Sequence, residues 1–221
     1  MNKVVVLERG KSVFGEEIQL QQRERDFEII SNGVFLMSTE NGQSEREMVK
    51  KAVAVMRRNP RQVLVGGLGV GHTADQVLRE GDNVNAHIVE IEPKIVEWQY
   101  KYLYPFSNRV LQREGASLII DDVSFWLERN PLCYDLICLD TDNGPDWIVA
   151  DRNAKLYRNE GLDLLYHRVT QGGAVSFWSA SRSQAFFQLL KEKFDRVYEY
   201  PVKVSATSQL PPDYVYIGCK D

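Results

Sequence analysis

The feature that most constrains the fold of this chain is the alternation of uninterrupted apolar runs with helical patterns after residue 62. The first run is QVLVGG, residues 62–67. Four similar runs follow it: AHIVEIE (86–92), SLIIDD (117–122), YDLICLDTD (134–142) and GGAVSFWS (172–179). Strands that are apolar throughout are buried on both faces, as in parallel sheets covered by crossover helices. The alternation therefore predicts an α/β fold with a mostly parallel sheet and helices on both faces.

Two further runs, RVYEYPVKV (196–204) and YVYIGC (214–219), lie near the C-terminus and are separated by a loop that contains Pro211 and Pro212. A short connection of this kind is typical of an antiparallel hairpin. We expect the hairpin at one edge of the sheet, which brings the expected number of strands in that sheet to seven.

The first 43 residues show a different pattern. Short strand-like runs cover residues 4–8, 16–23 and 27–39, and Ser31-Asn32-Gly33 marks a turn inside the last of them. We therefore expect a small β-segment over residues 1–43, followed by the main domain over residues 44–221. Ser44 with Glu47 three residues later predicts a capping box at the start of the first helix.

Composition and charge exclude several classes of partner. The 27 Lys and Arg residues against 31 Asp and Glu residues give a net charge of −4, and no long basic run is present. A nucleic-acid partner is therefore not expected, because binding to phosphates needs clustered basic side chains. No apolar stretch approaches the roughly 18 residues of a membrane span, so no membrane partner is expected.

The cysteines and histidines give no metal-binding pattern. Three cysteines are an odd number at no metal-like spacing, and Cys138 and Cys219 lie inside strand-like runs, where they are expected to be buried reduced thiols. The three histidines are scattered along the chain. We expect a cytoplasmic protein that binds no metal.

A Gly-rich turn follows the first apolar run, in the segment VLVGGLGVGHTA, residues 63–74. It contains four glycines within six positions: Gly66, Gly67, Gly69 and Gly71. Such a turn lets the backbone pass close to a ligand at the carboxyl end of the sheet. A dinucleotide fingerprint that began at Gly67 would place its third glycine at His72, which disfavours NAD and FAD. His72 itself is expected to be a surface residue in the first turn of the following helix.

Acidic residues end the next two strands. Glu90 and Glu92 end the run at 86–92, and a carboxylate there can accept hydrogen bonds from both hydroxyls of a ribose. Asp121 and Asp122 end the run at 117–122. One of them can accept a hydrogen bond from an adenine amino group, or it can cap the following helix. Both interpretations stay open, and one residue can do both.

The fourth apolar run ends in three acids, Asp140, Asp142 and Asp146, within nine residues. In this topology they would lie beside the Gly-rich turn. Solvated loop acids are one interpretation. The cationic centre of a sulfonium nucleoside explains them better, because a nearby cation favours the charged form of a buried carboxylate.

Taken together, these motifs resemble a known family. The Gly-rich turn, VEIEP (89–93), LIIDD (118–122), LDTDNGP (139–145) and the segment 153–178 resemble the spermidine synthase-like branch of class I S-adenosylmethionine (AdoMet)-dependent transferases. The resemblance extends from about Val13 to Cys219. It implies a Rossmann-like domain with a seven-stranded sheet, a small N-terminal β-segment and a homodimer.

The resemblance also implies roles for individual residues. The four glycines of the turn would lie against AdoMet or its decarboxylated form. Glu90 would bind the ribose, Asp122 and the backbone of Val123 would bind adenine, and Asp140 would be the base on the acceptor side. The candidates for the acceptor pocket are Asp142, Asn143, Trp147 and Tyr157. Ordinary packing in the core or at the surface is the alternative for the two aromatic residues.

Three motifs depart from the pattern of the polyamine-making members of that family. Their glycine motif carries an Asp that receives the amine of decarboxylated AdoMet, and Gly69 stands here instead. Asn143 replaces a second Asp, and Glu45-Arg46 replaces a Tyr-His pair. Without the acid at position 69, one reason to reject the carboxylate of ordinary AdoMet is lost.

These departures lead to three hypotheses. The main one is an AdoMet-dependent transferase that transfers a methyl group to a small molecule. The alternative is an aminopropyltransferase of polyamine biosynthesis, which uses decarboxylated AdoMet and an amine acceptor. The third is a non-catalytic nucleoside-binding or dimerisation protein that kept the fold.

Overall fold

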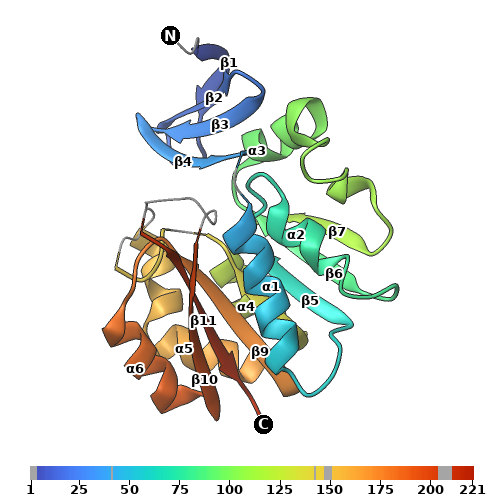
Figure 1. Cartoon of the computed structure of the whole chain (residues 1–221), viewed down its shortest axis with the longest axis vertical. Helices are drawn as coiled ribbons and strands as arrows, with labels where there is room; N and C mark the ends of the chain where they lie inside the picture. Colours follow the sequence, from blue (N-terminus) through green and yellow to red (C-terminus); the bar gives the residue numbers. More distant parts are fainter. Residues whose placement is uncertain (1–3, 41, 142, 147–150, 204–210) are drawn as a thin grey trace.

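The computed structural model describes residues 4–40, 42–141, 143–146, 151–203 and 211–221, with two sheets (Figure 1). The smaller sheet is antiparallel, in the order β1-β2-β3-β4, and contains the N-terminal segment. Its strands are β1 (Val4–Lys11), β2 (Glu17–Arg23), β3 (Asp26–Ser31) and β4 (Val34–Ser38). The expected turn at Asn32-Gly33 separates β3 from β4, and both residues have positive φ.

The larger sheet has seven strands in the order β10-β11-β9-β8-β5-β6-β7. They are β5 (Gln62–Gly66), β6 (Asn85–Glu90), β7 (Ala116–Ile120), β8 (Tyr134–Leu139), β9 (Val169–Ser179), β10 (Arg196–Val202) and β11 (Asp213–Cys219). β5 to β9 pair in parallel, whereas β11 is antiparallel to both β9 and β10. The prediction of a mostly parallel seven-stranded sheet with an edge hairpin is confirmed.

Helices cover both faces of this sheet (Figure 1). One face packs against α1 (Gln43–Val55), α2 (His72–Val77) and α3 (Pro93–Trp98), and the other against α4 (Val123–Arg129), α5 (Asn159–Arg168) and α6 (Gln184–Lys193). The described residues also form a short π-helix, η1 (Gln99–Leu103), and two 3-10 helices, η2 (Val110–Gln112) and η3 (Asp151–Tyr157). Val63 and Val65 of β5 lie in the first core and Leu64 in the second, which is why this strand is apolar throughout.

The predicted capping box at Ser44 is wrong. Helix α1 begins at Gln43 with Gly42 as the N-cap, and no side chain caps it. Ser44 is buried in the first turn, and its Oγ donates to Glu45 Oε2 at 2.8 Å. Gly42 packs directly on an imidazole, since a Cβ at this position would lie 2.2 Å from His72 Cδ2. Tertiary packing on His72 therefore sets the start of the helix.

Side chains of the small sheet connect it to the main domain through hydrogen bonds and apolar packing. Glu8 of β1 accepts hydrogen bonds from Trp98 Nε1 at 3.0 Å, Lys101 Nζ at 3.0 Å and Tyr102 at 3.1 Å. Apolar side chains of β2 and β3 also lie in the same buried cluster as residues of α1, α2 and α3. The two parts of the chain thus share one core.

Candidate functional site

The Gly-rich turn lies against the carboxyl end of β8. Gly67, Gly69 and Gly71 all have positive φ, which favours glycine. A Cβ at Gly67 would lie 2.2 Å from the backbone oxygen of Asp140, so glycine is also required for the close approach. Gly71 is the left-handed N-cap of α2.

Glu90, at the end of β6, holds this turn in place. Its Oε2 accepts from the backbone N–H of Leu68 at 2.8 Å and of Gly69 at 3.4 Å, and its Oε1 accepts from Glu92 N at 2.8 Å. Burial raises the pKa of Glu90, and the three backbone donors lower it in part. The carboxylate has about four acceptor positions, so one stays open for a ligand hydroxyl.

A cavity of about 170 Å³, the smaller of two at this end of the sheet, contains most of the residues predicted to bind the nucleoside. Gly67, Gly69, Glu90, Asp122 and Val123 all line it. The Asp122 carboxylate caps α4 by accepting from the backbone N–H groups of the second and third residues after it, at 2.8 and 3.4 Å. Both interpretations of Asp122 therefore agree with its position. Gly66 ends β5 beneath the turn, and Gly71 lines the larger cavity instead.

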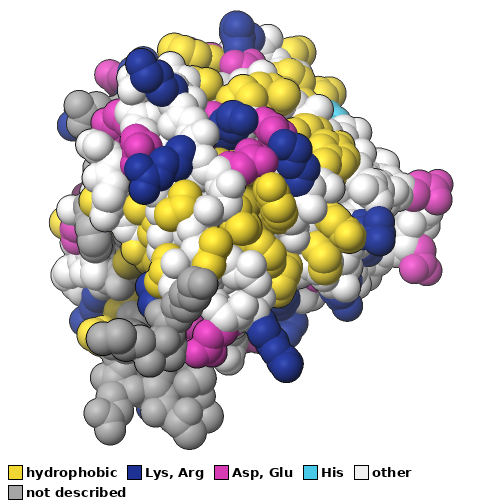
Figure 2. All heavy atoms as spheres, turned by 90° about the horizontal axis from the view of Figure 1, so that it is seen from above, with side chains coloured by type: hydrophobic (Ala, Val, Ile, Leu, Met, Phe, Trp, Pro, Cys, Tyr) yellow, Lys and Arg dark blue, Asp and Glu magenta, His cyan; other side chains and the backbone are white. Residues whose placement is uncertain are grey.

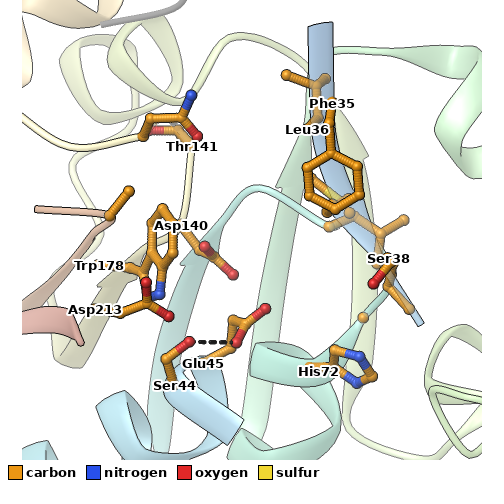
Figure 3. A pocket seen from close by; sticks show the side chains of 17 residues that line it. Phe35, Leu36, Ser38, Ser44, Glu45, His72, Asp140, Thr141, Trp178 and Asp213 are labelled. Atoms are coloured by element: carbon orange, nitrogen blue, oxygen red, sulfur yellow. Dashed lines mark hydrogen bonds between the residues drawn. The ribbon is translucent and has the colours of Figure 1, made fainter. Parts of the chain in front are cut away.

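The larger cavity, whose lining side chains are drawn in Figure 3, has a volume of about 360 Å³ and adjoins the smaller one. The two share part of their walls: Leu36, Met37, Gly69, Asp140 and Thr141. Asn143, predicted for the acceptor pocket, also lines the larger cavity. Asp140 thus lies at the junction, where a ligand in one cavity would meet a ligand in the other.

Three carboxylates line the larger cavity, from Glu45 in α1, Asp140 after β8 and Asp213 at the start of β11 (Figure 3). Burial raises the pKa of all three. The charge of Asp140 raises the pKa of Glu45 further, and that of Asp213 raises the pKa of Asp140. Hydrogen bonds from Thr73 to Asp140, at 2.7 Å, and from Ser44 to Asp213 oppose these shifts.

The expectation that His72 is a surface residue is wrong. Its side chain is 5% exposed and lines the larger cavity, because α2 is covered on all sides and its six residues are all buried. Its Nδ1 lies 2.8 Å from the guanidinium of Arg46. Burial lowers the pKa of His72 to about 4, and the charge of Arg46 lowers it as well, so the imidazole is neutral at pH 7.

One residue predicted for the acceptor pocket, Tyr157, does not line this cavity, and two others cannot be placed. Tyr157 is 5% exposed and packs in the core, with ring centroids 5.9 Å from Phe177 and 5.5 Å from Phe186. It is not among the described residues that line either cavity. Asp142 and Trp147 lie outside the described residues.

The sequence pattern does not predict Glu45 or Asp213 as site residues. Glu45 stands at the position of the Tyr-His pair of the polyamine-making members, and an acid at this position is the available signal. Asp213 directly follows Pro211-Pro212 in a loop without a motif, and nothing in its neighbourhood marked it. Trp178 of β9 also lines the larger cavity.

Comparison with known proteins agrees with this fold. A Rossmann-like sheet with cavities beyond the carboxyl ends of β5, β6 and β8 belongs to the class of open α/β folds, in which ligands generally bind at this edge of the sheet. Residues 42–199 match the spermine/spermidine synthase domain, so the chain belongs to the spermine/spermidine synthase family.

Two curated relatives are polyamine aminopropyltransferases. Polyamine aminopropyltransferase 2 of Pseudomonas aeruginosa is 26% identical over 181 residues, covering 76% of this chain and 50% of the relative. The polyamine aminopropyltransferase of Thermococcus kodakarensis is 30% identical over 185 residues, covering 80% of this chain and 63% of the relative. The chain thus spans less than two thirds of the length of these two relatives.

Solved structures share the fold. A spermidine synthase in complex with the transition-state analogue AdoDATO superposes with a TM-score of 0.81 at 17% identity, covering 98% of this chain and 74% of the other. The spermidine synthase of Thermotoga maritima gives 0.77 at 18% identity, with coverages of 98% and 72%. Across the described residues, no helix is long and apolar enough to cross a membrane.

Proposed function

We propose that this protein transfers an aminopropyl group from decarboxylated AdoMet to an amine acceptor. The observation that carries the proposal is the charge of the larger cavity. Three carboxylates line it, and no lysine or arginine is found among its described lining residues. Such a cavity favours cationic ligands. Buried carboxylates repel one another, which raises their pKa values, and a bound cation would remove this repulsion and stabilise their charged forms.

This charge distribution bears on the choice of donor. The tail of ordinary AdoMet carries an ammonium and a carboxylate, and burial of that carboxylate beside Glu45, Asp140 and Asp213 would place like charges together. The tail of decarboxylated AdoMet carries the ammonium alone. The expectation of methyl transfer depended on the absence of an acid at position 69. Other residues supply acids to the larger cavity, so this absence does not leave the cavity without negative charge. The curated relatives also favour the aminopropyl alternative.

The chemistry is an in-line displacement. The acceptor nitrogen attacks the propyl carbon bound to the sulfonium, the C–N bond forms, the C–S bond breaks, and methylthioadenosine leaves. An amine with a pKa near 10 must lose a proton before it attacks, which costs roughly 4 kcal/mol at pH 7. In this proposal Asp140, at the junction of the two cavities, accepts this proton, and its raised pKa supports the role because it makes the carboxylate a stronger base. Thr73 orients the Asp140 carboxylate.

Mass spectrometry of the products tests this proposal. We expect the protein to convert decarboxylated AdoMet and a diamine to methylthioadenosine and an aminopropylated amine. Asp140→Asn should lower turnover by about 10²- to 10⁴-fold and leave affinity for methylthioadenosine, which carries no positive charge, within threefold. Methylated acceptor and S-adenosylhomocysteine from ordinary AdoMet would instead support methyl transfer. No turnover with either donor across a panel of amines would favour the non-catalytic hypothesis.

A further inference from the structure

The smaller cavity has walls from two parts of the chain. The main domain contributes the Gly-rich turn and the acids at the ends of β6 and β7. The small sheet contributes Leu36 and Met37 of β4, together with Ser12, Phe14 and Glu16 from the turn that joins β1 to β2. This sheet lies beside α3 (Figure 1). A nucleoside in the cavity would therefore meet the small sheet as well as the main domain.

The turn between β1 and β2 is held in shape by its own hydrogen bonds. The backbone N–H of Ser12 donates to Glu16 O at 2.8 Å, and its carbonyl accepts from Gly15 N at 2.9 Å. The Ser12 Oγ accepts from the backbone N–H of Phe14 at 3.2 Å. Gly15 has a φ of +85°, a value that favours glycine. The turn therefore presents Phe14 in a defined position at the edge of the cavity.

Glu92 connects this turn to the main domain. It lies between β6 and α3, is 6% exposed, and accepts from the backbone N–H of Val13 at its Oε2, over 2.9 Å. Its Oε1 accepts from Lys94 N at 3.2 Å, which caps α3. Its own backbone N–H donates to Glu90, the residue that holds the Gly-rich turn. One buried residue thus joins the two walls of the cavity through hydrogen bonds, and those to its charged side chain are of the stronger kind.

Phe14 supplies an aromatic surface beside the polar groups of this cavity. Glu90 and Asp122 can accept hydrogen bonds from the edges of a nucleoside, but carboxylates give no partner to the flat face of a base. Phe14 lines the same cavity and is 43% exposed. Aromatic side chains stack on bases, and a bound base would cover part of this exposed apolar surface.

We propose that Phe14 contacts the nucleoside of the donor, and that Glu92 is the positioning residue that holds Phe14 against it. This inference rests on the proposed function for the identity of the nucleoside. Glu92 acts through the backbone of Val13, the neighbour of Phe14 in the turn. Glu92 also lines the cavity, so the test must separate this positioning from a direct contact with the ligand.

Two single variants test the two parts of the proposal in calorimetric titration with methylthioadenosine. Phe14→Ala should bind at least fivefold more weakly than the wild type, because it loses the stacking surface. Phe14→Tyr keeps the ring and should stay within twofold. Glu92→Asp keeps the charge and can still cap α3, but its shorter side chain withdraws from Val13. This variant should also lose at least fivefold in affinity.

The double variant shows whether Glu92 acts through Phe14. In the Phe14→Ala background, Glu92→Asp should change the affinity by less than twofold, because no ring remains to be positioned. A loss of twofold or more in that background would mean that Glu92 contacts the ligand directly or that its replacement disturbs the whole cavity, and it would overturn the positioning role. A loss below fivefold in either single variant would overturn the proposal, and so would a wild type that shows no binding.

Phe125→Ala is the matched control, and thermal melting should show every variant folded. Phe125 of α4 is 45% exposed and is not among the described residues that line either cavity, so affinity for methylthioadenosine should not change. With saturating decarboxylated AdoMet, Glu92→Asp should leave kcat and the KM for 1,4-diaminobutane within twofold. A larger change would show damage beyond the donor cavity and overturn the positioning role. If the wild type transfers no aminopropyl group, the proposed function fails, whereas the titrations with methylthioadenosine still decide this inference.

Discussion

At the scale of single residues, the acids at this end of the sheet differ in what compensates their charge. Glu90 accepts three backbone hydrogen bonds, and Asp122 accepts two at the start of α4. These two acids hold the local backbone in place. Glu45, Asp140 and Asp213 have only hydroxyl donors among the side chains described around them, and all three have raised pKa values. In the proposed function, a cationic ligand would compensate the charge of this second group.

Replacement of Glu90 by Gln should weaken nucleoside binding. An amide keeps the shape but loses a charged acceptor, and hydrogen bonds to charged groups contribute about 1.5–3 kcal/mol. We expect methylthioadenosine to bind about 10- to 100-fold more weakly in calorimetric titration. Glu97→Gln on α3, which removes an acid paired with Lys94 and Lys101, is the control and should leave affinity unchanged. Unchanged affinity in Glu90→Gln would contradict the assignment of the ribose to this residue.

Replacement of Asp213 by Asn should stabilise the protein above neutral pH. Burial raises the pKa of Asp213, so the folded state binds this proton more tightly than the unfolded state. The stability that this group contributes is fully present below the pKa of an unfolded Asp, about 3.9. It is lost as the pH rises through the higher pKa of the folded state. At pH 8 we therefore expect the Tm of Asp213→Asn to exceed that of the wild type.

Differential scanning fluorimetry from pH 4 to pH 8 measures this difference. The gap in Tm should shrink as pH falls, and Asp82→Asn at an exposed turn should show no comparable trend. A lower Tm for Asp213→Asn at pH 8 would mean that the carboxylate stabilises the fold.

At the scale of elements, the strands were predictable because their pattern is local. β8 contributes Leu136 and Cys138 to one core and Ile137 and Leu139 to the other. A strand that is buried on both faces is apolar at every position, so the sequence alone indicates it. The Gly-rich turn was predictable for the same reason. The start of α1 and the burial of His72 were not, because both depend on packing between α1 and α2. Glu45 and Asp213 come from distant segments, and only the folded sheet brings them to one cavity.

Replacement of Gly67 by Ala should damage the Gly-rich turn. The new methyl group would overlap the backbone oxygen of Asp140 at 2.2 Å, and the φ of +93° is itself strained for alanine. Gly33→Ala is a matched control, because its φ is +78° and nothing lies within 4 Å of its Cβ. We expect the control to lose about 1–3 kcal/mol from its backbone conformation. Urea unfolding should show a larger loss for Gly67→Ala, together with lost methylthioadenosine binding. Equal losses in the two variants would contradict the close approach.

At the scale of the whole molecule, the small sheet takes part in the site and also presents apolar surface. Met37 and Leu36 of β4 line both cavities. Hydrophobic side chains gather on the face of the molecule seen in Figure 2, and the exposed ones of the small sheet include Val5 at 42% and Val34 at 48%. Both lie on edge strands, which need covering in a soluble protein.

The homodimer implied by the family resemblance can be tested on this sheet. Val5→Lys should place a charge on the edge strand β1 and convert a dimer to a monomer in light scattering coupled to size-exclusion chromatography. Leu132→Lys, at an exposed apolar position outside the small sheet, is the control and should leave the mass unchanged. A wild-type protein that elutes as a monomer at micromolar concentration would contradict the prediction.

The central claim is that acids of the larger cavity make this protein select a donor with a cationic tail. Calorimetric titration of the wild-type protein with decarboxylated AdoMet and with AdoMet, with methylthioadenosine as the common reference, tests it most directly. We predict that decarboxylated AdoMet binds at least tenfold more tightly than AdoMet. Equal or tighter binding of AdoMet would show that the cavity tolerates a carboxylate, and it would contradict the claim.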